Sequence, residues 1–101
     1  MSNIHDFGLE KDVLSSILAV LRRHPIQKAV IYGSRARGDF KHSSDIDIAI
    51  WTDDSDSKHF LKMDLDEYVP TACSFDVADY ERTDCQALRA NIIKDGIIIL
   101  S

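Results

Sequence analysis

The chain has 101 residues, of which 45% are hydrophobic and 29% charged, and 17 acidic against 12 basic residues give a net charge of −5. This length accommodates one core, so we expect residues 1–101 to form a single domain. The acidic balance disfavours direct nucleic-acid binding, because proteins that grip a nucleic-acid backbone usually present a basic face. No apolar run reaches the ~20 residues that cross a bilayer. The N-terminus shows no secretion signal, so we expect a cytoplasmic protein with no membrane partner.

The hydrophobic pattern predicts helices and strands that alternate along the chain. Helical spacing of apolar residues, short β-branched runs and one strictly alternating segment define the elements. In chain order we expect a helix at 9–24, a strand at 28–32, a helical turn at 35–37, a strand at 45–52, a helix at 57–69, a strand at 72–80, a helix at 83–94 and a strand at 97–100. This order predicts one α/β domain.

Several residues predict where the helices begin and end. Pro25 ends the first helix, and Pro70 ends the third. Serines of the acidic loop that precedes residue 57 are expected to cap the third helix. Thr83 and Gln86 have the spacing of a capping box, which predicts that the last helix begins there.

Asp45 and Asp47 open the strand at 45–52, where every second side chain points to the same face. Their carboxylates therefore project side by side, on the face that also carries Ala49 and Trp51. Two like charges this close raise each other's pKa unless a cation lies between them. Because Mg²⁺ typically binds one or two carboxylates together with phosphate oxygens, the pair indicates a candidate magnesium site.

Only ten residues separate Ser34 from Asp45, so the chain must turn back promptly. If the two flanking strands run antiparallel, Gly33 and Ser34 share one edge of the sheet with the two aspartates. Gly33 permits close backbone approach, and the helical turn that follows aims N–H groups outward, which favours an anion. A phosphate cradle beside a metal clamp is an arrangement for phosphoryl or nucleotidyl transfer.

Asp76 supplies a third acid. It points away from the apolar side chains of its strand, and a crossover through the preceding helix makes that strand parallel to the one that carries Asp47. Asp76 then lies beside Asp47, as a ligand of a second metal ion or as the base that accepts a proton from an attacking hydroxyl. Asp79 is a weaker candidate, since it points with Phe75 and Val77.

Together these residues resemble a known family. Gly33-Ser34, ten intervening residues and Asp45-Ile46-Asp47 resemble the GSx10DxD signature of nucleotidyltransferases with the DNA polymerase β fold. The wording "GSRARGDFKHSSDIDIAI" is similar to the single-domain branch called minimal nucleotidyltransferases, or MNT proteins. The segments "FDVADY" and "NIIKDGIIIL" extend the likeness over nearly the whole chain.

The resemblance implies a polymerase β-like fold, with a short mixed sheet flanked by helices, and roles for named residues. Members carry a nucleoside triphosphate, usually ATP, hold two Mg²⁺ ions and transfer a nucleoside monophosphate to a hydroxyl with release of pyrophosphate. Mapped onto this sequence, Gly33 and Ser34 bind the β- and γ-phosphates. Arg37 neutralises triphosphate charge, and Arg35 either does the same or pairs with local acids at the surface. The catalytic and metal-binding residues are Asp45, Asp47 and Asp76.

The resemblance also implies a protein partner. Minimal members pair with a small helical HEPN-type protein, commonly an RNase toxin, and some silence it by attaching AMP to a tyrosine. Larger relatives carry a helical acceptor domain that has no counterpart in this sequence, so we expect a partner to supply that surface. The apolar strand at 97–100 offers a sheet edge, so a homodimer or hetero-oligomer is also expected.

Three hypotheses for function stay open at this point. The chain is an antitoxin that adenylylates its partner, a nucleotidyltransferase that modifies a small-molecule hydroxyl with help from a helical partner, or a non-catalytic antitoxin that acts by sequestration. The same three acids serve the first two hypotheses, and only the acceptor differs between them.

Overall fold

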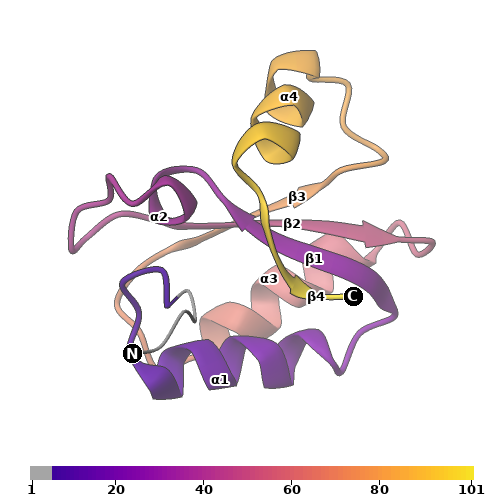
Figure 1. The fold of residues 1–101 in the computed structure, drawn as a ribbon. Coiled ribbons are helices and arrows are strands. Elements are labelled where there is room, and N and C mark those ends of the chain that lie inside the picture. The colour runs from indigo at the N-terminus through magenta and orange to yellow at the C-terminus, as the bar shows by residue number, and fades with distance from the viewer. Residues whose placement is uncertain (1–5) are drawn as a thin grey trace.

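The computed structural model describes residues 6–101, which form helices and strands in the predicted alternating order (Figure 1). The elements are α1 (Lys11–Leu21), β1 (Ile26–Tyr32), α2 (Ser34–Arg37), β2 (Ile46–Thr52), α3 (Ser57–Tyr68), β3 (Phe75–Asp79), α4 (Gln86–Asp95) and β4 (Ile97–Leu100). None of the helices within these residues combines the length and the apolar character that a membrane crossing requires.

The four strands form one mixed sheet in the order β3-β2-β1-β4. β1 pairs antiparallel with both β2 and β4, and β2 pairs parallel with β3. The expected antiparallel first pair, parallel second pair and mixed sheet are therefore confirmed. β3 and β4 are the two edges, and pairing of β4 with another chain stays a prediction.

The register of the strands brings the candidate residues together. Tyr32, the last residue of β1, lies opposite Asp47 of β2, and Asp47 lies opposite Asp76 of β3. Gly33 and Ser34 follow Tyr32 directly, so they lie beside the same row of residues, across the ends of the strands, as the carboxylates. This placement confirms the expected arrangement of the strand ends.

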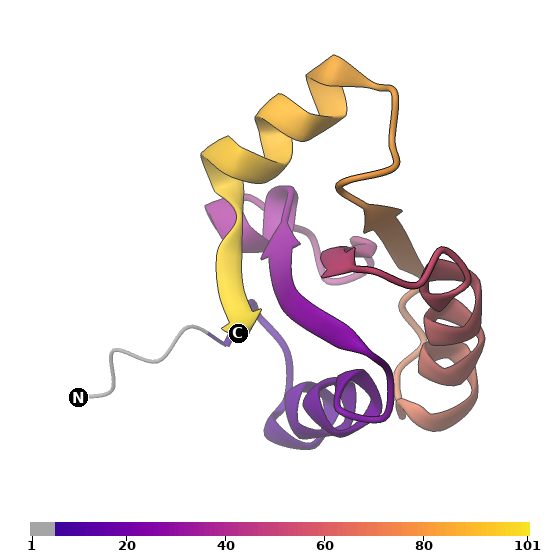
Figure 2. The ribbon, with the colours of Figure 1, turned by 90° about the vertical axis from the view of Figure 1, so that its right-hand side faces the viewer.

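The two faces of the sheet are covered differently. α1 and α3 pack on one face, whereas α4 lies over the other (Figures 1 and 2). The first face holds the main core, which includes the fully buried Ile46, Ile48 and Ile50 of β2. The second face holds a smaller cluster, in which Ile92 of α4 packs with Val30, Tyr32, Ala49 and Ala78. We call these the closed face and the open face.

Some helix boundaries differ from the prediction. α1 ends at Leu21, earlier than expected, because the last turn tightens: the N–H groups of Arg23 and His24 bond to the carbonyls of Val20 and Leu21, and Pro25 follows. The predicted serine cap of α3 is wrong: Asp56 is the N-cap, it makes no side-chain capping bond, and Ser57 is buried against Thr52.

The predicted capping box of the last helix is also wrong. α4 begins at Gln86, and its N-cap Cys85 makes no side-chain capping bond. The hydroxyl of Thr83 instead accepts a hydrogen bond from the backbone N–H of Cys85 at 3.3 Å. Threonine readily forms such local turns, which compete with helix capping.

Candidate active site

Gly33 joins β1 to the short helix α2 in a conformation that favours glycine, with φ +76° and ψ −154°. A Cβ atom added at this position would overlap the carboxylate of Asp47. The bare Cα therefore leaves room for the Asp47 side chain directly beside the turn. The first amides of a helix have no partner within the helix, so the backbone that follows Gly33 can meet an anion.

The three acids occupy the expected edge of the sheet. Asp47 is half-buried in β2, and Asp76 is exposed in β3 directly opposite it. Asp45 is exposed and immediately precedes β2. The strand was predicted to begin at Asp45, but it begins at Ile46. It also lines a cavity of about 390 Å³ with the segment that precedes β3.

The electrostatics of this edge are dominated by negative charge. The pKa of Asp47 is raised from 3.8 to about 6, first by burial and then by the charges of Asp76 and Asp45, while Arg37 partly offsets the shift. The pKa of the Tyr32 hydroxyl is also raised, by burial first and then by Asp76 and Asp47. Tyr32 therefore stays protonated and neutral at the centre of the site.

The donor set suits a hard divalent cation, although the side chains are not gathered around one point. Within residues 6–101, no three His, Cys, Asp or Glu side chains form a group arranged to hold a metal ion. The charges of Asp76 and Asp45 nevertheless both act on Asp47, and three carboxylates have the chemistry that Mg²⁺ selects. The bare Cα of Gly33 lets the Asp47 carboxylate lie directly against the turn, so the carboxylates and the turn would meet a ligand together.

Arg37 lies at the same edge. Its guanidinium pairs with Asp95 of α4 at 3.0 Å and with Asp39 at 3.3 Å, and its side chain is exposed. The lowering effect of Arg37 on the pKa of Asp47 shows that its charge reaches the acidic cluster. Because the Arg37 side chain is itself exposed and its partner Asp39 lies at the surface, while Asp95 is nearly buried, the guanidinium can be shared with a bound phosphate.

Arg35, two residues earlier, is placed quite differently. It is 2% exposed, so it is not the surface arginine that the sequence suggested. Its guanidinium donates hydrogen bonds to the carbonyl oxygens of Phe7, His42 and Ser44 at 3.0–3.3 Å. Since these bonds hold the loop between α2 and β2 and bury the charge, Arg35 cannot reach a triphosphate. We therefore exclude it from the nucleotide site.

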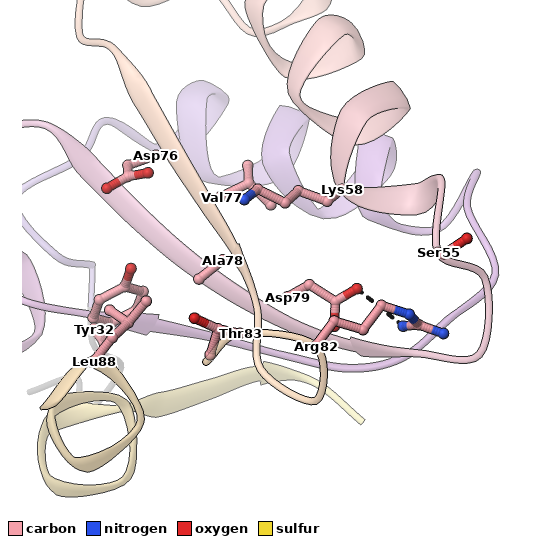
Figure 3. Close-up of a pocket in the computed structure, with 10 residues that line it drawn as sticks. All are labelled: Tyr32, Ser55, Lys58, Asp76, Val77, Ala78, Asp79, Arg82, Thr83 and Leu88. Carbon is pink, nitrogen blue, oxygen red and sulfur yellow. Dashed lines mark hydrogen bonds and ion pairs between the residues drawn. The ribbon is translucent and has the colours of Figure 1, made fainter. Parts of the chain in front are cut away.

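A cavity of about 270 Å³ begins at Asp76 and continues along β3 (Figure 3). At its far end Asp79, 6% exposed, pairs with Arg82 at 3.0 Å. The other carboxylate oxygen of Asp79 is buried and has no hydrogen-bond partner in the part of the chain that the structure describes. The sequence indicated Asp79 only as a weak candidate, and it gave no sign of Arg82 or of Lys58, which lines the cavity from α3.

Comparison with known proteins agrees with this geometry. A family model described as "Polymerase beta, Nucleotidyltransferase" matches residues 15–101. A search of the curated proteins finds no match. Among solved structures, the chain is similar to one of a toxin–antitoxin with AMP-PNP, at 22% identity and a TM-score of 0.69, over 84% of this chain and 70% of that one. It is also similar to one of the toxin–antitoxin MntA-HepT, at 19% identity and a TM-score of 0.64, over 88% and 70%. At these identities the likeness shows the fold.

Proposed function

We propose that this chain, which belongs to the polymerase beta family of nucleotidyltransferases, transfers AMP from ATP to a hydroxyl of a partner protein. The observation that carries the proposal is the register that aligns Tyr32, Asp47 and Asp76 beside the Gly33-Ser34 turn. The family gives the reaction class, and the nucleotide, the metal ions and the acceptor are the parts that we propose.

The triphosphate is proposed to lie at the Gly33-Ser34 turn. Gly33 allows the phosphates to approach the backbone closely. The guanidinium of Arg37 adds a positive charge, and it can release Asp39 or Asp95 and bind a phosphate oxygen instead. ATP is the proposed nucleotide because one structure with this fold is that of a toxin–antitoxin with AMP-PNP. ATP is a cytoplasmic metabolite, so we propose that the protein works in the cytoplasm.

Asp45, Asp47 and Asp76 are the proposed ligands of two Mg²⁺ ions. Bound there, divalent ions would neutralise the charge that develops on the phosphates and favour ionisation of the attacking hydroxyl. To bind metal, the carboxylates must be ionised. In the free protein the raised pKa of Asp47 disfavours its ionised form. Metal binding therefore relieves the repulsion within the cluster.

In the proposed reaction, the hydroxyl oxygen attacks the α-phosphorus, and the bond between that phosphorus and the β-phosphate oxygen breaks. Pyrophosphate leaves with the electron pair, and the hydroxyl proton passes to the carboxylate of Asp76. Tyr32, neutral and placed opposite Asp47, can donate a hydrogen bond to a phosphate oxygen at this point.

The proposed acceptor is a tyrosine of a small helical HEPN-type protein. Solved structures of toxin–antitoxin complexes that share this fold support a partner of that kind. The cavity beside Asp76 also favours an acceptor supplied by another chain. Lys58 of α3 and Leu88 of α4 line it, and it lies along β3, an edge strand of the sheet.

The test is label transfer from ATP carrying ³²P at the α-phosphate, in the presence of Mg²⁺ and the protein encoded next to this chain. We expect the label on the neighbouring protein, none with Asp45→Ala/Asp47→Ala, and none when the γ-phosphate carries the label. Absence of α-label from a folded pair would contradict the proposal.

Two further outcomes separate the alternatives. Release of pyrophosphate with a small hydroxyl compound, but not with the neighbouring protein, would assign a small-molecule acceptor. If the doubly substituted variant still protects cells from the toxin, sequestration suffices and the transfer reaction is secondary.

A further inference from the structure

The cavity beside Asp76 lies along a free edge of the sheet. Four consecutive residues of β3, 76–79, line it, although consecutive residues of a strand point to opposite faces. A cavity that meets both faces of a strand must lie at the outer edge of that strand. β3 is an edge strand, paired with β2 alone among the described residues.

The main-chain groups of Val77 are the ones at this edge that can pair with another strand, because the carbonyl of Asp79 already accepts hydrogen bonds from the N–H groups of Arg82 and Thr83. The carbonyl of Ser74 and the N–H of Tyr80 both bond to β2, so the even-numbered residues of β3 direct their main-chain groups toward β2. By alternation, the N–H and C=O of Val77 point away from the sheet, into the cavity. Lys58 of α3 and Leu88 of α4 lie on its two sides (Figure 3).

The strand order indicates which of the two substrates, the nucleotide or the acceptor, this cavity would bind. In phosphoryl transfer the attacking and leaving oxygens lie roughly in line through phosphorus. Gly33-Ser34, where the leaving pyrophosphate is proposed, follows β1, while Asp76 lies on the opposite side of Asp47, in β3. The acceptor must therefore approach across β3, where the cavity lies.

Asp79 gives a second indication of a ligand. Its Oδ2 pairs with Arg82, but its Oδ1 is buried and no group within residues 6–101 donates a hydrogen bond to it. A buried polar atom without a partner lowers stability, and a donor from a bound chain would remove that cost. Asp79 lies three residues beyond Asp76, or roughly 10 Å along the strand, within reach of a short extended segment.

We infer that the acceptor binds as an extended peptide segment, which adds as a strand to the outer edge of β3 and places its hydroxyl at Asp76. Val77 supplies the main-chain pairing, and Asp79 accepts a hydrogen bond from the segment. This inference rests on the proposed function for the identity of the transferred group, but the peptide site itself is independent of it.

The test uses the ¹⁵N-labelled protein and two probes. The first probe is Mg²⁺ with a non-hydrolysable ATP analogue, which reports the nucleotide site through residues 33–37. The second is a capped pentapeptide of threonine and valine around a central tyrosine, titrated to several millimolar. We expect the peptide to shift the amide signals of residues 76–80 and 82–88, and N-methylation of its backbone to weaken binding at least tenfold.

Two pairs of variants add matched controls. Leu88→Trp and Lys58→Trp fill the cavity from α4 and α3, and each should weaken peptide binding at least tenfold. Ile93→Trp and Met63→Trp replace exposed residues on the same two helices and should leave it unchanged. The ¹⁵N spectrum of each variant shows whether it is folded.

The outcomes separate the inference from the proposed function. Binding of the nucleotide analogue without peptide shifts at β3, or equal binding of the N-methylated peptide, would overturn the strand site. Equal binding of a single capped tyrosine would also overturn it, in favour of a small-molecule pocket. Peptide binding at β3 without nucleotide binding would support the site and contradict the proposed function.

Discussion

The two faces of β2 have opposite effects on the stability of the fold. On the closed face, Ile46, Ile48 and Ile50 are fully buried against α1 and α3. On the open face, Asp47 is half-buried beside other acids, which raises its pKa to about 6. Full burial of an isoleucine contributes ~1.5–3 kcal/mol, whereas gathering like charges opposes folding. The closed face therefore stabilises a strand register that the open face uses to hold mutually repelling carboxylates.

The largest expected effects come from substituting, one at a time, two neighbouring residues of β2. Asp47→Ala should reduce AMP transfer by about 10²–10³-fold or more, the range seen when one electrostatic contact to a transition state is lost. It should leave the melting temperature unchanged or higher, because it removes a repelled charge. Ile48→Ala should lower the free energy of unfolding by ~2–5 kcal/mol. Label transfer and urea unfolding measure the two effects, and strong destabilisation by Asp47→Ala would contradict the comparison.

The two arginines that flank Ala36 sharpen the same contrast. Arg35→Ala should destabilise the fold by ~2–4 kcal/mol, because the carbonyls of His42 and Ser44 lose buried hydrogen bonds. Arg37→Ala should destabilise the fold less than Arg35→Ala, since the Arg37 side chain is exposed and its pair with Asp39 lies at the surface, although Asp95, with 9% of its side chain exposed, loses its partner. It should instead raise the KM for ATP. Thermal unfolding and ATP titration distinguish the two variants, and equal effects on both readouts would refute the separate roles.

Gly33→Ala tests the close contact between the turn and the open face. The added methyl group overlaps the Asp47 carboxylate, and φ of +76° is unfavourable for alanine. We expect a loss of ~1–3 kcal/mol in stability together with a loss of transfer activity. Gly38→Ala is the matched control: its φ is +94°, but a Cβ there meets nothing within 4 Å. It should lower stability while retaining activity.

The smallest expected effect is a dependence of stability on pH. The folded protein holds the Asp47 proton more tightly than the unfolded chain, since the pKa is raised from 3.8 to about 6. This contribution is fully present below pH 3.8 and is lost as the pH rises through about 6. Asp47→Asn should therefore stabilise the metal-free protein by roughly 1 kcal/mol at pH 7.5, after allowance for solvent screening, and by much less at pH 4. Melting temperatures at both pH values test this, and an equal shift at both would contradict it.

The main features of the fold could be predicted because they depend on local patterns. Alternation in β2 separates Asp47 from Ile48, and the ten-residue spacing after Ser34 indicates a prompt return of the chain, which is antiparallel in the structure. A parallel β3 then places Asp76 opposite Asp47. The predicted sequence of elements and the directions in which β1, β2 and β3 pair follow from these short-range rules.

The remaining features depend on contacts between residues that are distant in the sequence. Arg35 binds the carbonyl of Phe7, 28 residues away, so its motif position gave no indication of its burial. Arg82 joins Asp79 to the end of β2 through the carbonyls of Thr52 and Asp53. Such pairings can be read only from the assembled fold.

The central claim is that the acids of the open face bind divalent metal together with the nucleotide. Paramagnetic Mn²⁺, added in substoichiometric amount with a non-hydrolysable ATP analogue, broadens the NMR signals of nearby amides and tests this directly. The account predicts broadening at residues 33–34, 45–48 and 76, with α1 unaffected. Broadening centred on the acidic loop at residues 53–56, or absent from β2 and β3, would contradict it.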